Sequence, residues 1–399
     1  MKSPDRAIGA IFVVVVAVGV AAFTWASTDL FEVGNSNVGD LVQVESMSFP
    51  RADHTAVLMD DGRVLVLGGG DGETFSYLSA EIYDPVTRTW EKSPNLGTPR
   101  RDHRSVLLQD GRVLTTGGLD HFGITFTAEI FDPGSGESAA GRGMRSQRAL
   151  HTLTPISDGR VLVAGGMSGV TPLEFTDLFN PENGRFEAGP DLNGPRAWHT
   201  ATTLEDGRIL IVGGSGFGQA RQSVEALTPG AEEFDVLEPL ETARFLHTAT
   251  LIPDGRVVVI GGQETVDVFA TVEIYDPATG RWTAGASMPD QRTQHTATLL
   301  NDGRILVAGG FNVVSDIDDV SIYDPKRDTW SSVGTLSNAR GRHTATLLND
   351  GSVLIVGGID DTPITEVGFF ELSGVPRPEA DLFFPDGAPA DLLPDPVER

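Results

Sequence analysis

The sequence of 399 residues contains no cysteine and only three lysines, and helical periodicity is hard to find after its N-terminal segment. Without cysteine the chain can form no disulfide, no thiolate nucleophile and no thiolate metal site. The formal net charge is −27, so we expect no binding to nucleic acid or to an anionic membrane surface. The 47 glycines and 24 prolines favour a turn-rich, all-β protein.

One long apolar run stands near the N-terminus. Ala7–Trp25 carries no charge and follows Lys2 and Arg6. Its length is close to the ~18–20 residues that span a hydrocarbon core, and the basic residues orient it with the rest of the chain outside. We expect residues 1–27 to be an outward-facing membrane anchor or, if they are cleaved, the signal peptide of a periplasmic or secreted protein. Residues 28–39 then form a linker.

The strongest feature of the sequence is an internal repeat. Seven of the eight histidines recur every 48 or 49 residues, each three residues after an arginine and fourteen residues before a Gly-Gly pair. The histidines are His54, His103, His151, His199, His247, His295 and His343. The arginines are Arg51, Arg100, Arg148, Arg196, Arg244, Arg292 and Arg340. This period indicates seven structural repeats in one register.

Each repeat predicts four short strands. Between the histidine and the glycines, two apolar runs flank an Asp-Gly pair, as in HTATLLNDGRILVAGG from His295, which predicts a hairpin with a two-residue type I′ turn. A third strand ends in Tyr-Asp-Pro or a related triplet, as at Tyr83, and an aromatic residue such as Trp90 opens a fourth strand. Four antiparallel strands per repeat make one blade of a β-propeller.

The double glycine, the aromatic residue before a turn and the spaced tryptophans resemble the kelch repeat. The resemblance covers residues 40–373 and implies an all-β, seven-bladed β-propeller of four-stranded antiparallel blades. Bacterial kelch arrays of this type are similar to the central domain of galactose oxidase. That similarity implies a copper site with tyrosine and histidine ligands and a tyrosine crosslinked to cysteine, which this chain cannot form without cysteine.

The two ends of the repeat array complement each other. Residues 40–47 read as a fourth strand with no repeat before it, whereas the seventh repeat has a degraded third strand near residues 369–370 and no fourth strand. We expect the N-terminal strand to complete the last blade and so to remove an exposed edge. The Pro- and acid-rich tail, 374–399, is expected to hold no packed element, although Phe383 and Phe384 could dock on the propeller.

The repeated histidines and arginines are expected to be structural, because adjacent blades hold their copies too far apart to share one ion at about 2.1 Å. Function is then expected in the unrepeated loops of one face, either as a polar ligand site or as an ordinary solvated surface. The candidate ligand-binding residues are Asp71, Arg101, His121, Trp198, Arg221, Glu264, Asp316, Arg342 and Asp360. His121 is the one histidine outside the repeat and is the candidate acid or base.

A cluster of acids in the last two repeats is the candidate cation site. Its members are Asp316, Asp318, Asp319, Asp360 and Asp361. Calcium prefers several carboxylate and carbonyl oxygens, but spacing alone does not show that these groups converge. The expectation is therefore no cofactor, with calcium as the alternative.

Three functions from different classes remain open. The first is a monomeric, extracytoplasmic binding module for a protein or glycan, because no known catalytic motif is found. The second is a carbohydrate-active enzyme of the epimerase or lyase type, which needs only a paired acid and base at the mouth of the propeller. The third is a structural or adhesive protein of the cell surface.

Overall fold

The structure is a computed structural model that describes residues 39–72, 75–361, 374–389 and 392. These residues form β-strands and turns, and no helix among them could cross a membrane. The apolar run at 7–25 lies outside the described residues.

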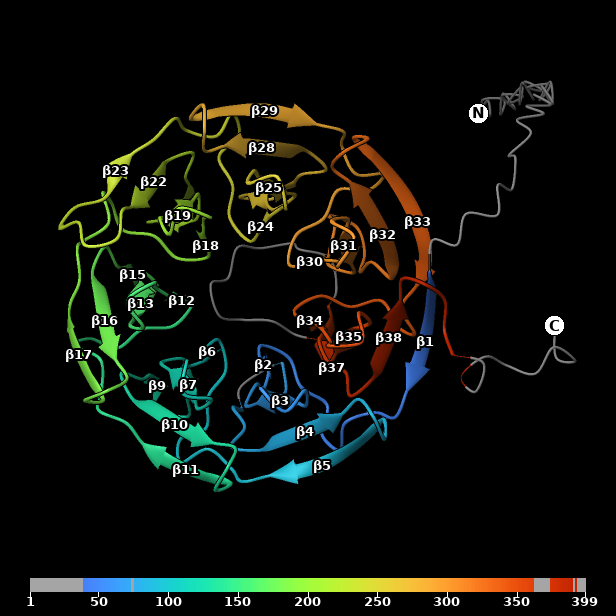
Figure 1. The fold of residues 1–399 in the computed structure, drawn as a ribbon, viewed down its shortest axis with the longest axis horizontal. Coiled ribbons are helices and arrows are strands. Elements are labelled where there is room, and N and C mark those ends of the chain that lie inside the picture. Colours follow the sequence, from blue (N-terminus) through green and yellow to red (C-terminus); the bar gives the residue numbers. More distant parts are fainter. Residues whose placement is uncertain (1–38, 73–74, 362–373, 390–391, 393–399) are drawn as a thin grey trace, which may run out of the picture. The chain divides into compact units, whose positions relative to one another are not determined.

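Seven four-stranded antiparallel sheets form a ring (Figure 1), which confirms the predicted fold. The innermost strands are β2 (Thr55–Leu58), β6 (Arg104–Leu107), β12 (Thr152–Pro155), β18 (Thr200–Thr203), β24 (Thr248–Leu251), β30 (Thr296–Leu299) and β34 (Thr344–Leu347). Each contacts the next, and β34 contacts β2, so the ring is closed. Blades one to seven are numbered in this order.

The second and third strands of each blade form its buried centre. The second strands are β3 (Val64–Leu67), β7 (Val113–Thr116), β13 (Val161–Ala164), β19 (Ile209–Val212), β25 (Val257–Ile260), β31 (Ile305–Ala308) and β35 (Val353–Val356). The third strands are β4 (Ala80–Asp84), β10 (Ala128–Asp132), β16 (Thr176–Asn180), β22 (Val224–Leu227), β28 (Val272–Asp276), β32 (Asp319–Asp324) and β38 (Ala380–Phe384). The second strands are buried along their whole length, because neighbouring blades cover both of their faces.

The fourth strands lie at the rim of the ring. They are β5 (Thr89–Ser93), β11 (Glu137–Ala140), β17 (Arg185–Ala188), β23 (Asp235–Val236), β29 (Arg281–Gly285), β33 (Thr329–Thr335) and, in blade seven, β1 (Asp40–Val44). Five two-stranded hairpins follow the Gly-Gly pairs: β8 (Leu119–Asp120) with β9 (Gly123–Ile124), β14 (Met167–Ser168) with β15 (Thr171–Pro172), β20 (Ser215–Gly216) with β21 (Gln219–Ala220), β26 (Gln263–Glu264) with β27 (Asp267–Val268), and β36 (Ile359–Asp361) with β37 (Gly374–Pro376). We call the face that carries these hairpins the hairpin face.

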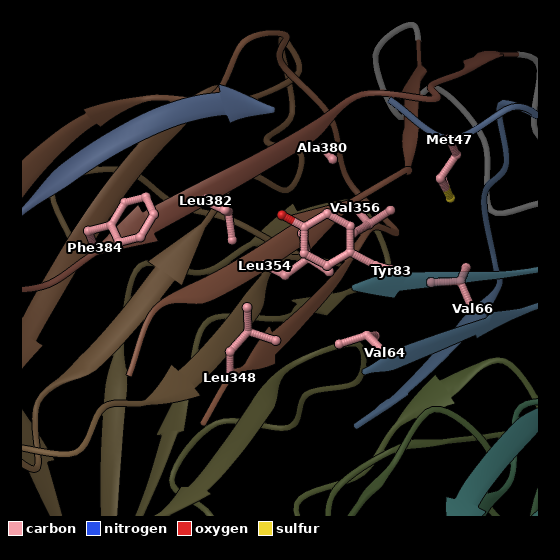
Figure 2. Close-up of a cluster of buried hydrophobic side chains, with 10 residues drawn as sticks. All are labelled: Met47, Val64, Val66, Tyr83, Leu348, Leu354, Val356, Ala380, Leu382 and Phe384. Atoms are coloured by element: carbon pink, nitrogen blue, oxygen red, sulfur yellow. The ribbon is translucent and has the colours of Figure 1, made fainter. Parts of the chain in front are cut away.

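Blade seven is built from both ends of the chain. Its strand order is β1-β38-β35-β34, which confirms the predicted closure by an N-terminal strand. Figure 2 shows the core where this blade meets blade one: Tyr83 of β4 lies among Leu354, Val356 and Leu382 of blade seven. The ring is therefore closed by hydrogen bonds within blade seven and by apolar packing between blades seven and one.

The third strand of blade seven was predicted in the wrong place. The segment near 369–370 lies outside the described residues, and the strand is β38, within the expected tail. Asp381 of β38 pairs with Arg340 at 2.5 Å, and Phe383 lies opposite Val353 with its side chain fully buried. The sequence Ala380–Phe384 thus repeats the acid-apolar-aromatic pattern of the other third strands, which the surrounding prolines and acids obscured.

The turn between the first two strands also differs from the prediction. In blade one the Gly62 N–H donates to the Met59 carbonyl, and only Gly62 of these turn residues has a positive φ, 85°. The turn is therefore longer than the predicted type I′ hairpin, and glycine supplies the left-handed conformation at its end. Asp61 instead accepts a hydrogen bond from the Arg63 N–H with its side chain.

Removing Asp40–Val44 should lower the melting temperature sharply and cause aggregation. The deletion exposes the edge of β38 and uncovers the buried clusters against which Leu41, Val42 and Val44 pack. Melting can be followed by circular dichroism, with Gln43→Ala as the control because the Gln43 side chain is exposed. A deletion variant that melts like the wild type would contradict this account of closure.

Candidate functional site

The seven repeated arginines form ion pairs, each with an acid on the third strand of its own blade, and both partners are buried in every blade except the sixth, where Asp319 is 27% exposed. The pairs are Arg51–Glu81, Arg100–Glu129, Arg148–Asp177, Arg196–Glu225, Arg244–Glu273, Arg292–Asp319 and Arg340–Asp381, with N–O distances of 2.5–2.9 Å. These arginines are at most 1% exposed. Five of the acids, Glu81, Glu129, Glu225, Glu273 and Asp381, also bind the chain that crosses from rim to axis by accepting its N–H groups, as Glu129 does with Gly97 and Thr98. The role of the arginines is therefore structural, as predicted, although their acidic partners were not foreseen.

The seven repeated histidines are buried next to these arginines. Burial, followed by the nearby Arg51 charge, lowers the pKa of His54 to about 3, and the other six pKa values are lowered in the same direction. In six blades Nε2 lies 2.9–3.1 Å from a threonine hydroxyl at the start of the preceding blade, as in His103 and Thr55. Neutral rings held in this way link blades and are unsuited to acid–base work near neutral pH.

The residue before each histidine forms a ring around the axis on the hairpin face. Its members are Asp53, Asp102, Leu150, Trp198, Leu246, Gln294 and Arg342, and we call them the axial ring. Each has a φ between 52° and 60°, the left-handed region that residues other than glycine rarely adopt. From Asp102 to Arg342, each N–H donates to the carbonyl of the previous member at 3.1–3.3 Å. The ring holds seven different side chains in one repeated backbone conformation.

One part of the axial ring is charged. Arg342 pairs with Asp53 at 3.0 Å and donates from Nε to Gln294 Oε1. Burial and then the Asp53 charge raise the pKa of Asp102 to about 7, although Arg342, Arg101 and Arg104 oppose that rise. These groups come from both ends of the repeat array, which ring closure brings together.

Arg104 belongs to this charged group and interrupts the histidine–threonine links. It occupies the position that is threonine in the other six blades, so His151 bonds to Thr116 within the hairpin of blade two instead. Burial lowers the pKa of Arg104, and the charges of Asp102 and Asp53 partly offset that effect. Asp53, Asp102 and Arg104 were not among the predicted site residues, although comparing the positions beside each histidine would have singled out Arg104.

The opposite part of the axial ring is apolar. Leu150, Trp198 and Leu246 follow one another, and the Trp198 and Phe245 rings lie 6.0 Å apart. Trp198 also lines a pocket of about 260 Å³. The other lining residues are Met167, Val170, Ser215, Phe217 and Gly218.

Exposed apolar side chains stand on the same face at the tips of three hairpins and in the corresponding loop of blade six. Phe122 is 99% exposed, Val170 85%, Phe217 71% and Val314 74%. They occupy corresponding places, four or five residues after the first glycine of the Gly-Gly pair. Val170 and Phe217 come together with Trp198 at the pocket described above, whereas Phe122 and Val314 lie on other blades. Exposed apolar side chains that gather around a pocket are typical of interaction surfaces.

The predicted ligand residues are distributed over this face. Trp198 and Arg342 belong to the axial ring, and Arg101 adjoins it. Asp71 accepts the Phe75 N–H within its own loop, and His121 is exposed with its ring 6.0 Å from that of Phe75. Arg221, Glu264 and Asp360 lie in or beside the hairpins of blades four, five and seven, and Asp316 lies in the corresponding loop of blade six. The structure thus brings together the axial members of the prediction but not the whole set.

Two of the acids proposed as a cation site, Asp319 and Asp360, form ion pairs with arginine. Asp319 pairs with the buried Arg292, Asp360 pairs with Arg377, and Asp318 is exposed. Across residues 39–72, 75–361 and 374–389, no three His, Cys, Asp or Glu side chains are grouped as metal ligands. The copper centre implied by the resemblance does not fit either, because Tyr83, Tyr275 and Tyr323 are buried between blades.

Comparisons with known proteins agree with this architecture. The family model of the KLHDC2/KLHL20/DRC7 Kelch-repeats domain matches residues 150–358, and the Kelch motif model matches residues 50–97. No curated protein matches the sequence. Solved structures that match include a fungal alcohol oxidase of the AA5 family in complex with copper, at 17% identity and TM-score 0.68, covering 88% of this chain and 77% of that one. The structure of YjhT matches at 13% identity and TM-score 0.58, covering 73% of this chain and 99% of that one.

Arg244→Ala should lower the free energy of unfolding by about 3–5 kcal/mol, because it leaves the Glu273 carboxylate buried without its cation. Urea denaturation measures the change. The control is Arg208→Ala, which removes a more exposed turn pair with Asp206 and should cost about 1 kcal/mol or less. Equal losses in the two variants would contradict the structural role of the buried pairs.

The Asp102 carboxyl should make stability depend on pH. Its pKa is raised from 3.8 to about 7, so between these values the folded state binds more protons than the unfolded state and stability falls as pH rises. Asp102→Asn lacks this effect and should therefore gain stability relative to the wild type between pH 5 and 8 in urea denaturation. Asp110→Asn is the control. Hydrogen bonds from Arg112 hold the pKa of Asp110 below its usual range, so this carboxyl does not titrate between pH 5 and 8. A constant difference between wild type and Asp102→Asn would refute the assignment.

Proposed function

The chain belongs to the kelch-repeat family, and we propose that its propeller is a binding module that engages a protein partner through the hairpin face. The observation that carries this proposal is the set of exposed apolar tips around the axial ring, with the Trp198 pocket beside them. Apolar and aromatic side chains of this kind are the anchors of protein interfaces.

The chemistry of the face suggests how a partner would bind. An apolar side chain of the partner enters the pocket of about 260 Å³ lined by Val170, Trp198 and Phe217. Polar groups of the partner meet the charged part of the axial ring, where Asp102 and Arg342 lie. Because the two parts differ in polarity, they would fix the orientation of the partner as well as its affinity.

We further propose that the propeller acts as a monomer outside the cytoplasmic membrane. The support for its location is the uncharged run Ala7–Trp25 behind Lys2 and Arg6. Protease treatment of intact cells tests this location, because an exported propeller carrying a protease site in an exposed loop would be cleaved without lysis. Light scattering of the purified protein tests whether it is a monomer.

Site-specific photo-crosslinking in the producing cell tests the protein partner. A photoreactive residue at position 217 or 122 should give discrete protein adducts, and one at position 182, on an exposed turn at the opposite end of blade three, should not. Trp198→Ala should reduce the adducts roughly tenfold or more, since a buried aromatic anchor is worth about 2 kcal/mol. Adducts of equal yield at position 182, or glycan binding that is lost in Trp198→Ala, would overturn the proposal.

A further inference from the structure

The junction between blades three and four departs from the repeat at one register position. The residue opposite the start of the second strand is aromatic in six blades: Tyr83, Phe131, Phe179, Tyr275, Tyr323 and Phe383. In blade four it is Leu227, opposite Ile209. Blade four therefore lacks the ring that the other blades place here.

The other junctions show what this ring does. Tyr83 fills the space between blades seven and one, where it packs in one cluster with Leu348 and Leu354 (Figure 2). Its ring lies 5.1 Å from that of Trp90, whose indole N–H donates to the Glu45 carbonyl at the end of the preceding blade. The two aromatic residues thus fill the space between the blades from its centre to its rim, and we call this pair of contacts the seal of the junction.

Both parts of this seal are altered in blade four. Phe234 occupies the tryptophan position and has no N–H to donate. The Pro190 carbonyl, which corresponds to the acceptor Ala286 of the Trp330 indole, binds the Thr176 hydroxyl instead. Beyond Phe234 the rim strand is shortened to Asp235–Val236. These changes weaken the closure between the two blades.

A cleft of about 540 Å³ lies at this junction. Its apolar wall includes Leu178, Ile209 and Leu227, which are each less than 10% exposed. Asp158 and Arg160 of the blade-three turn and Glu232 of blade four form its polar rim. The volume lies within the range of about 300–1,000 Å³ that is usual for small-molecule sites. It exceeds the space that one side-chain ring requires.

A turn arginine of the preceding blade stands before phenylalanine in blades two, three and seven and before tyrosine in blades five and six. The two tyrosine blades show how such an arginine accommodates a hydroxyl group. Burial raises the pKa of Tyr275 and Tyr323, and the charges of Arg208 and Arg256, respectively, partly offset that rise. A turn arginine therefore lies within electrostatic range of the tyrosine hydroxyl in blades five and six. Arg160 occupies the same position before blade four and lies on the rim of the cleft, paired with Asp158 at 2.6 Å, but the residue that corresponds to the two tyrosines is Leu227.

We propose that the cleft between blades three and four binds a phenol ring supplied from outside the chain. The ring packs on Leu178, Ile209 and Leu227, and its hydroxyl faces Arg160. Because Arg160 is already paired with Asp158, the cleft suits a neutral hydroxyl better than a carboxylate. The phenol can belong to a free small molecule or to a tyrosine side chain of a protein. This site is separate from the hairpin face and does not depend on the function proposed for that face.

Ligand-observed NMR titration with p-cresol tests the proposal, with N-acetyl-tyrosinamide as the second probe. We expect the wild-type protein to bind p-cresol and Leu227→Phe to lose at least tenfold in affinity, because the added ring fills the cleft. The same variant should melt at a higher temperature. Ala231→Phe narrows the rim without changing the core, so it replaces Leu227→Phe if that variant fails to fold. Unchanged binding in a folded filling variant, or no binding to the wild type, overturns the proposal.

A second pair of variants tests the hydroxyl contact. Arg160→Met should lower the affinity for p-cresol at least threefold and leave the affinity for toluene unchanged. Arg208→Met, the matched turn variant in blade four, should change neither affinity. An equal loss of affinity for p-cresol and for toluene in Arg160→Met would overturn the role of the hydroxyl. Binding of both phenols identifies a tyrosine side chain as an admissible occupant, and exclusion of N-acetyl-tyrosinamide restricts the site to free phenols.

Discussion

The buried arginine–acid pair of each blade is the interaction on which the propeller depends. Between blades the chain must cross from the rim to the axis, and such an irregular segment cannot satisfy its backbone groups through a sheet ladder. In blade two the acid Glu129 accepts N–H groups of this segment, and Arg100, which lies in the segment, reaches back to Glu129 and to the Gly117 carbonyl. The arginine–acid pair itself is present in all seven blades. A charged pair with its hydrogen bonds satisfied in this way fixes the path of the crossing.

Because this device recurs in every blade, departures from the repeat carry the specific information. Arg104 replaces a threonine beside the axis and joins the charged group around Asp102. Leu227 replaces an aromatic residue between blades and is associated with a cleft. Both substitutions leave the buried pair of their own blade intact, Arg100–Glu129 and Arg196–Glu225, so the scaffold tolerates them.

The sequence was sufficient to predict the blades but not the contacts across the axis. The constant spacing of the repeats determines which residues occupy the same position in each blade. The fourth-strand sequence at residues 40–47 correctly predicted that an N-terminal strand completes blade seven. The last third strand was missed because prolines and acids around Ala380–Phe384 suggested an unpacked tail. Asp53 and Asp102 were also missed, since no local pattern shows that ring closure places Arg342 beside them or that their backbone adopts a positive φ.

The use of arginine in this chain connects the scaffold with the candidate site. Of the 29 basic residues, seven lie in the buried pairs and six more pair with turn aspartates, so thirteen cations serve repeated structural roles. The other sixteen basic residues lie outside these two repeated roles. Three such cations, Arg101, Arg104 and Arg342, act on one carboxyl group, Asp102. The repeat does not require this concentration of positive charge at the axis, which makes the axial ring the place where the sequence departs furthest from what the scaffold needs.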